Sequence, residues 1–163
     1  MTQIENTVNL LSRSLETLKM TLADFSDADM LVRPCPGANH AAWQLGHLTN
    51  AETGMVNAVQ PGALPAAPAG FAEKFKKETA SVDDPKFFPG KAELVDAFST
   101  ARAATIAWAQ SLSQADLDRP APEKFLRFAP TVGLMLLMMP SHVMMHTGQF
   151  QVIRRKLGKP MLF

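Results

Sequence analysis

Four histidines are the residues of this chain best suited to chemistry, and two of them, His142 and His146, lie four residues apart. On a helix this spacing places both imidazoles on one face, about one turn apart, where they can bind the same metal ion. Residues 128–153 contain no Asp, Glu, Lys or Arg, so the two imidazoles are expected in an apolar interior. A buried imidazole without a partner costs about 1–3 kcal/mol. A shared cation removes that cost for both, although two hydrogen-bonded histidines near a bundle end would explain the same spacing.

A third ligand must come from another helix, and His47 is the best candidate. Ala51 and Gly54, one and two turns further along its predicted helix, leave space beside the imidazole. Three histidines leave coordination positions open, which is typical of catalytic and not of closed structural sites. The ion would lower the pKa of a bound water or thiol. That bound nucleophile, and no particular side chain, is therefore assigned the catalytic role.

Three further residues are candidates for binding a substrate. Gln149 lies one turn beyond His146, where it could hydrogen-bond a ligand or orient an imidazole. A polar residue that satisfies the bundle interior is an equally good interpretation. Asn50 and Trp43 lie on the His47 face of their helix and are weaker candidates, because a tryptophan on a buried helix face more often belongs to the core.

Four other residues are not assigned as ligands of the metal. His40 lies about 10 Å from His47 along the helix axis, too far to share an ion, and is expected near the pocket rim in a structural or surface role. Glu52 is about 140° around the helix from His47, so it is not a ligand. Cys35 lies in a proline-flanked loop with no histidine nearby. Arg154 is expected to complement a helix dipole, with contact to an anionic substrate as the alternative.

Apolar residues at helical spacing predict four long helices and one all-α domain, a four-helix bundle that spans residues 1–163. No segment shows the sustained alternation of apolar and polar residues that is typical of strands. The predicted helices lie at about residues 4–22, 40–59, 91–112 and 131–157.

Capping and breaking residues predict where these helices begin and end. Asn39 is the predicted N-cap of the second helix, and Ser113 is predicted to cap a brief turn at about residues 114–117. Gly158 is a good stop for the last helix, which Pro140 should kink.

The connection between the second and third helices, at about residues 60–90, is unusually long and contains five prolines. So long a connection in a compact domain indicates a crossover or a lid. We therefore expect the second and third helices to be parallel, with a short helix near residues 71–80.

Composition narrows the class of protein. Sixteen basic and fifteen acidic side chains give a formal net charge of +1, which argues against a basic surface that binds nucleic acid. The single cysteine excludes an internal disulfide and a Cys-rich zinc module. No secretory signal is visible at the start, so a cytoplasmic protein is expected. Residues 128–153 could span a membrane by length, but polar residues such as Ser141 and Gln151 indicate a helix buried in protein.

Three motifs together resemble the DinB-like superfamily of helical metal-dependent proteins. They are Trp-Gln-Leu-Gly-His-Leu at 43–48, His-Val-Met-Met-His-Thr-Gly-Gln at 142–149, and Arg-Arg-Lys-Leu-Gly-Lys-Pro at 154–160. The resemblance implies an up-down-down-up bundle that holds a metal, typically zinc or nickel, through His47, His142 and His146. It also implies a homodimer and a small-molecule substrate.

The same resemblance suggests a reaction class. Two relatives of known activity in the superfamily that the sequence resembles are mycothiol-dependent maleylpyruvate isomerase and bacillithiol transferase. Both use low-molecular-weight thiols. We therefore expect a metal-dependent S-transferase or hydrolase, with a thiol as a cosubstrate of the transferase. No residue of this sequence identifies the thiol.

Two other functions remain open at this point. Met138, Met139 and Met145 lie close to the histidine pair in sequence and could form a soft Cu(I) site with it, although methionines on a buried helix are usually core. A metal-free helical module for dimerisation or binding is the second alternative.

Overall fold

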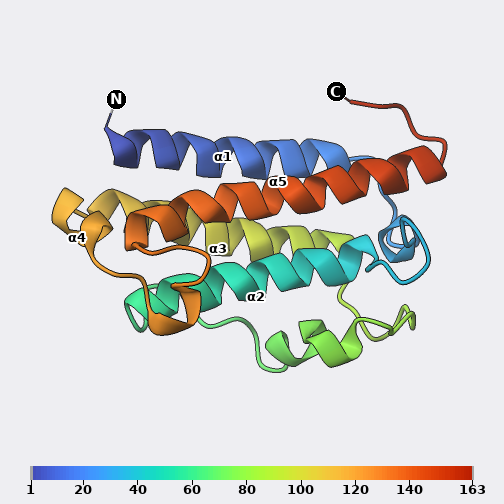
Figure 1. The fold of residues 1–163 in the computed structure, drawn as a ribbon. Helices are drawn as coiled ribbons and strands as arrows, with labels where there is room; N and C mark the ends of the chain where they lie inside the picture. The colour runs from blue at the N-terminus through green and yellow to red at the C-terminus, as the bar shows by residue number, and fades with distance from the viewer. Residues whose placement is uncertain (1, 163) are drawn as a thin grey trace.

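The computed structural model describes residues 2–162, and four long helices form its body (Figure 1). They are α1 (Gln3–Leu22), α2 (Ala41–Val59), α3 (Lys91–Ser111) and α5 (Val132–Lys156). Helices α1 and α5 run in one direction and α2 and α3 in the other, which is the predicted up-down-down-up course (Figure 1). No strand forms among residues 2–162, where an isolated bridge pairs Pro120 with Thr131. The predicted all-α four-helix bundle is confirmed.

The ends of the helices follow the capping residues in most places. Thr2 begins α1 through a capping box with Glu5, and Ser113 forms another with Asp116 to begin α4 (Gln114–Asp118). Gly158 has a φ of +68°, so it takes up the left-handed conformation that ends α5. Helix α5 passes through Pro140 as one uninterrupted element.

The prediction of Asn39 as the N-cap of α2 is wrong, because His40 occupies that position. The Nδ1 atom of His40 accepts the backbone N–H of Trp43 at 3.1 Å, and its Nε2 donates to the carbonyl oxygen of Val82 at 3.1 Å. His40 is fully buried. The sequence signal misled because a neutral imidazole can supply the same acceptor as an asparagine side chain.

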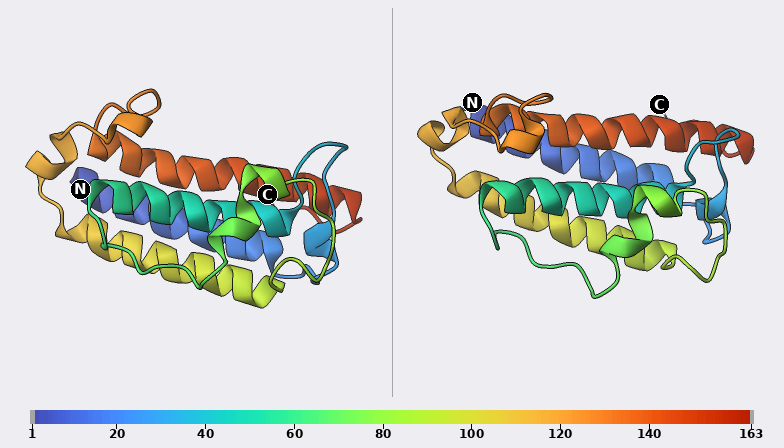
Figure 2. Two further views of the ribbon diagram at one scale, coloured as in Figure 1. Left: turned by 90° about the horizontal axis from the view of Figure 1, so that it is seen from below. Right: turned by 60° about the horizontal axis from the view of Figure 1, so that its bottom comes forward.

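The long connection crosses the bundle from the end of α2 to the start of α3 and lies outside these two helices (Figure 2). The predicted short helix at 71–80 is instead two separate 3₁₀ turns, Ala72–Phe75 and Lys77–Thr79. We call residues 71–80 the covering segment. Two further 3₁₀ turns, Asp29–Leu31 and Glu123–Phe125, lie in other connections.

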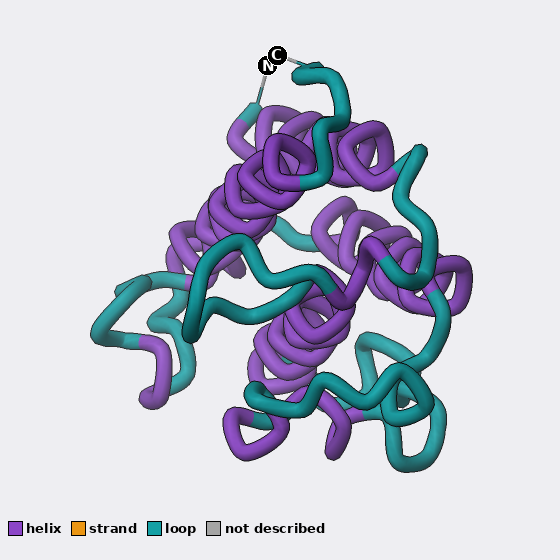
Figure 3. The backbone as a smooth tube through the Cα atoms, turned by 90° about the vertical axis from the view of Figure 1, so that its right-hand side faces the viewer, coloured by secondary structure: helices purple, strands orange, loops and turns teal. Residues whose placement is uncertain are grey.

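The covering segment is held against α2 by side chains of that helix. Trp43 Nε1 donates to the carbonyl oxygen of Lys76 at 3.2 Å and to Thr79 Oγ1 at 3.1 Å, and Asn50 Nδ2 donates to the carbonyl oxygen of Ala72 at 3.0 Å. The Trp43 bonds lie at the end of the bundle where α2 begins, which faces the viewer in Figure 3, and the Asn50 bond lies at the middle of α2.

A buried ion pair ties three helices together inside the bundle. Arg102 of α3 donates to both carboxylate oxygens of Glu52 on α2, at 2.7 and 2.6 Å. It also donates to the carbonyl oxygen of Leu11 and to Ser14 Oγ on α1. The Glu52 carboxylate is thus paired with Arg102.

None of the helices among residues 2–162 is long and apolar enough to cross a membrane.

Candidate metal centre

The three histidines that sequence analysis singled out lie side by side between α2 and α5. His47 comes from α2, and His142 and His146 come from α5. One ring nitrogen of each can be chosen so that all three lie within 4.8 Å of one another. The Nε2 atoms of His142 and His146 are 3.1 Å apart. Residues separated by almost a hundred positions in sequence thus place three imidazoles around one point.

Trp43 fixes the plane of the His47 ring. The two rings are stacked, with centroids 5.1 Å apart and planes within 6°. Because the Trp43 indole N–H is hydrogen-bonded to the covering segment, that segment and His47 are linked through one rigid side chain. Trp43 is therefore positioned to orient a ligand, whereas sequence analysis had considered it for substrate binding.

Gln44 fixes the tautomer of His146. The Gln44 side-chain amide donates from Nε2 to the carbonyl oxygen of Asn39 at 2.5 Å, which leaves its Oε1 facing His146 Nδ1 at 2.6 Å. An amide oxygen only accepts, so the hydrogen-bond network assigns the proton of His146 to Nδ1. The lone pair of His146 Nε2 then points toward the other two imidazoles, as metal binding requires.

The same network places a proton between the two histidines of α5. Since His146 Nε2 is an acceptor, His142 must donate from its own Nε2 across the 3.1 Å contact. The proton therefore occupies the position that a shared cation would take. Metal binding at both Nε2 atoms requires His142 to give up this proton or to move it to Nδ1.

The site favours neutral imidazoles. Burial, with smaller contributions from the neighbouring His142 and His47, lowers the pKa of His146 to about 3. Burial, with a smaller contribution from His47, lowers the pKa of His142 to about 4, and burial alone lowers that of His47. All three side chains are thus neutral at pH 7, which is the form that binds a metal.

The donor set fits a transition metal. Two nitrogens at the usual 2.0–2.1 Å from a tetrahedral zinc are about 3.4 Å apart, close to the 3.1 Å separation of His142 and His146. Three imidazoles without a carboxylate suit zinc or nickel far better than magnesium or calcium. The methionines considered for a Cu(I) site have other surroundings: Met139 is buried in the core cluster with Leu11 and Val56, Met138 packs against that cluster, and Met145 is 57% exposed.

The remaining candidates have other surroundings. Gln149 is half-buried on α5, and the hydrogen bond that orients His146 comes from Gln44 instead. The side-chain amide of Asn50 is hydrogen-bonded to the covering segment. Arg154 is buried in an ion pair with Asp24, and Cys35 is exposed in its loop. The contact of Gln44 with the metal ligand His146 was not predicted. Its one signal in the sequence is a polar amide on a helix face that is otherwise apolar around Trp43 and Leu48.

Comparison with known proteins identifies the family. A sequence model of the DinB superfamily matches residues 10–150. The chain belongs to the DinB superfamily. The resemblance drawn from the three motifs is thereby confirmed, and a comparison with curated protein sequences gave no match.

Two solved structures share the fold of this DinB-superfamily protein. A conserved protein of Enterococcus faecalis superposes with a TM-score of 0.72 at 19% identity, over 98% of this chain and 99% of the other. YfiT of Bacillus subtilis superposes with a TM-score of 0.65 at 14% identity, over 96% of this chain and 89% of the other. YfiT is described as a probable metal-dependent hydrolase with an unusual four-helix bundle topology. At these identities the likeness shows the fold.

Proposed function

We propose that this protein is a divalent-metal-dependent enzyme that acts on a small molecule, with the metal held by His47, His142 and His146. The observation that carries the proposal is the convergence of three neutral imidazoles, one of which has its lone pair directed inward by Gln44. Zinc and nickel are the metals that this donor set favours. The description of YfiT as metal-dependent supports the same assignment.

The proposed reaction is attack on a small electrophile by a water or a low-molecular-weight thiol. A divalent cation at this position supplies Lewis acidity that lowers the pKa of such a nucleophile. Among the described residues, no carboxylate or lysine is hydrogen-bonded to the three imidazoles. Hydrolysis agrees with the description of YfiT, and thiol transfer with the resemblance to thiol-dependent enzymes.

The roles of the nearby side chains follow from their contacts. Trp43 and Gln44 hold two of the ligands, and Asn50 holds the covering segment beside them. Gln149, half-buried one turn beyond His146, is left as the side chain proposed to contact substrate. We further propose a cytoplasmic homodimer. Exposed apolar residues on the adjacent helices α1 and α5, such as Leu10 and Met144, support the dimer.

The test is elemental analysis of protein purified without a polyhistidine tag, since such a tag collects nickel. We expect about one zinc or nickel per chain, and loss of that metal in a folded His142→Ala/His146→Ala variant. Purified protein that retains metal is then assayed with hydrolysable esters and amides and with thiol acceptors. Absence of stoichiometric metal, even after incubation with zinc or nickel, would leave the metal-free helical module as the better explanation.

A further inference from the structure

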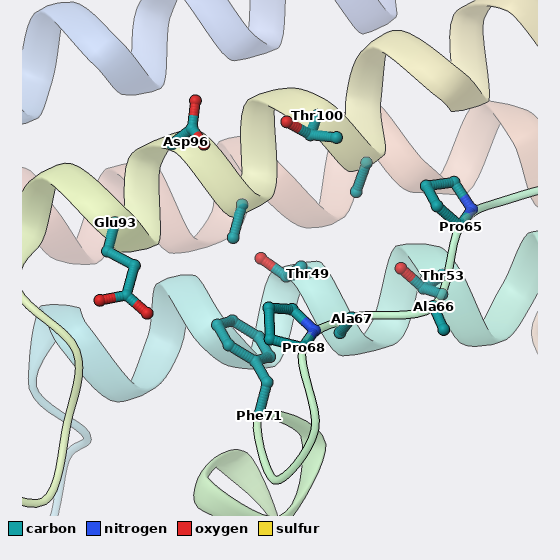
Figure 4. Close-up of a pocket in the computed structure, with 12 residues that line it drawn as sticks. Thr49, Thr53, Pro65, Ala66, Ala67, Pro68, Phe71, Glu93, Asp96 and Thr100 are labelled. Carbon is teal, nitrogen blue, oxygen red and sulfur yellow. The ribbon is translucent and has the colours of Figure 1, made fainter.

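A cavity of about 220 Å³ lies between α2, α3 and the connection that follows α2 (Figure 4). It is separate from the metal centre, because Thr49 on its wall is about 200° around α2 from His47. Thr53, one turn further on, lines the same cavity. Helix α2 therefore presents the metal centre on one side and this cavity on the other.

The inner part of the cavity is apolar, and its walls are formed by buried side chains and by two prolines. Phe71, Thr49 and Ala101 are 4%, 3% and 6% exposed and form its buried part. Pro65 and Pro68 form the side contributed by the connection, where their fixed φ angles restrict the chain. An engineered apolar cavity of about 150 Å³ is large enough for benzene. The present cavity therefore has room for a ring or a short branched chain.

The rim of the cavity is acidic. Glu93 and Asp96 of α3 are exposed there, and no Lys, Arg or His is among the lining residues. In Figure 4 the Glu93 side chain extends from α3 toward the side on which Phe71 lies, whereas the Asp96 carboxylate points away from Phe71. In the described part of the chain, neither carboxylate has an ion pair or a hydrogen bond. The first turn of α3 favours an acidic residue at Glu93, but Asp96 lies beyond that turn.

We propose that this cavity binds a small organic cation, an ammonium group attached to an apolar ring or chain. The apolar part of the ligand packs against Phe71 and Ala97, and the ammonium group pairs with Glu93. Two uncompensated carboxylates at the rim disfavour an anion of the same shape. The ring of Phe71 adds a favourable surface for a cation.

The experiment measures binding of benzylamine, which is a cation at neutral pH, to metal-free protein labelled with ¹⁵N. Chelation of metal removes any coordination of the amine at the histidines. We expect saturable shifts in the amide resonances of Thr49, Ala97 and Thr100, with benzyl alcohol bound at least fivefold more weakly and no saturation by benzoate. Equal binding of all three compounds, or no saturable shift with millimolar benzylamine, overturns the proposal.

Variants test the roles of charge and space. Glu93→Gln is expected to weaken benzylamine binding about fivefold, the equivalent of about 1 kcal/mol for an exposed ion pair. Ala97→Leu is expected to abolish binding by filling the cavity, and Ala97→Val is the milder substitute. Glu123→Gln, at an exposed residue of a 3₁₀ turn that does not line the cavity, is the control. Unchanged affinity in a Glu93→Gln/Asp96→Asn variant also overturns the proposal.

The outcome is independent of the proposed metal chemistry. A folded His142→Ala/His146→Ala variant is expected to bind benzylamine with unchanged affinity, since its substitutions lie on the other side of α2. Loss of binding in that variant assigns the amine to the histidine site and overturns the separate cavity site.

Discussion

The hydrogen bond from His146 to Gln44 is short, buried and directional, and it decides which nitrogen of the ligand is free. Gln44→Leu removes the acceptor but keeps a side chain of similar size. We expect metal affinity to fall by about 10–100-fold, as is common when a partner that orients a ligand is lost. Competition with a chromophoric chelator measures the affinity.

Two comparisons separate orientation of the ligand from general damage. Gln149→Leu, the same substitution one turn beyond His146, is expected to change metal affinity by less than about twofold, because Gln149 does not orient the imidazole. Long-range ¹H–¹⁵N spectra of the metal-free protein report the His146 tautomer directly. The role assigned to Gln44 is wrong if Gln44→Leu leaves both the Nδ1–H tautomer and the metal affinity intact.

The buried histidines make the stability of the metal-free protein depend on pH. The pKa of His146 is about 3 and that of His142 about 4 in the folded chain, against 6.5 for both without burial. The unfolded chain therefore binds more protons below pH 6.5, so the free energy of unfolding falls as pH falls toward these values. Each histidine is expected to contribute a loss on the order of 1–2 kcal/mol between pH 7 and pH 5.

Urea unfolding at pH 7, 6 and 5 measures this loss. Carboxylates with lowered pKa, such as Asp24 and Asp29, have an ordinary pKa of 3.8 and contribute little above pH 5. His142→Leu/His146→Leu is expected to flatten the pH dependence, while His40 and His47, whose pKa values burial also lowers, maintain a smaller slope. An unchanged slope in the double variant would contradict the assignment.

At the scale of elements, Gly46 allows the covering segment to lie against α2. A Cβ atom at this position would come within 2.3 Å of the Phe75 ring. Gly46→Ala is therefore expected to displace Phe75 and to lower the free energy of unfolding by about 1–3 kcal/mol. Urea unfolding and the rate of proteolysis within residues 71–80 measure the two effects.

Gly54 on the same helix provides a matched control. A Cβ atom there would meet nothing within 4 Å, so Gly54→Ala is expected to stabilise the helix by up to about 1 kcal/mol. If the two substitutions have the same effect, Phe75 does not pack as the structure places it.

The sequence was most informative where a structural feature depends on neighbours along one helix. The spacing of His142 and His146 requires only that α5 be helical, and the pairing with His47 follows once α2 and α5 are adjacent. The bond between Gln44 and His146 joins residues 102 positions apart, and it depends on the rotation of α2 and on the Asn39 carbonyl. Helical spacing carries no information about either.

Non-helical segments were predicted less well for a related reason. The prolines of the connection between α2 and α3 indicated its length and irregularity, but its 3₁₀ turns depend on anchors such as Trp43 and Asn50. The His40 cap likewise depends on Val82, 42 positions away, which holds the imidazole in place. Long-range side-chain contacts of this kind are specified by packing and not by local propensity.

At the scale of the whole molecule, the ion pair between Arg102 and Glu52 connects α3 to the helix that carries His47, and Arg102 also bonds α1. Both side chains are almost completely buried, and Glu52 lies on the helix that carries His47. Glu52→Gln leaves the Arg102 charge buried without its counter-ion. We expect this substitution to lower the free energy of unfolding by about 3–5 kcal/mol.

A double-mutant cycle distinguishes the value of the pair from the cost of breaking it. Replacing both residues, as Glu52→Leu/Arg102→Met, removes both charges and is expected to cost much less than either single substitution, because no buried charge is left unpaired. Urea unfolding of the metal-free variants measures the four stabilities, and chelator competition measures the metal affinity of the double variant. If the pair acts mainly as a positioning element, the double variant stays folded but binds metal more weakly, since α2 no longer has a fixed rotation relative to α1 and α3. Full stability together with unchanged metal affinity would show instead that apolar packing alone orients His47.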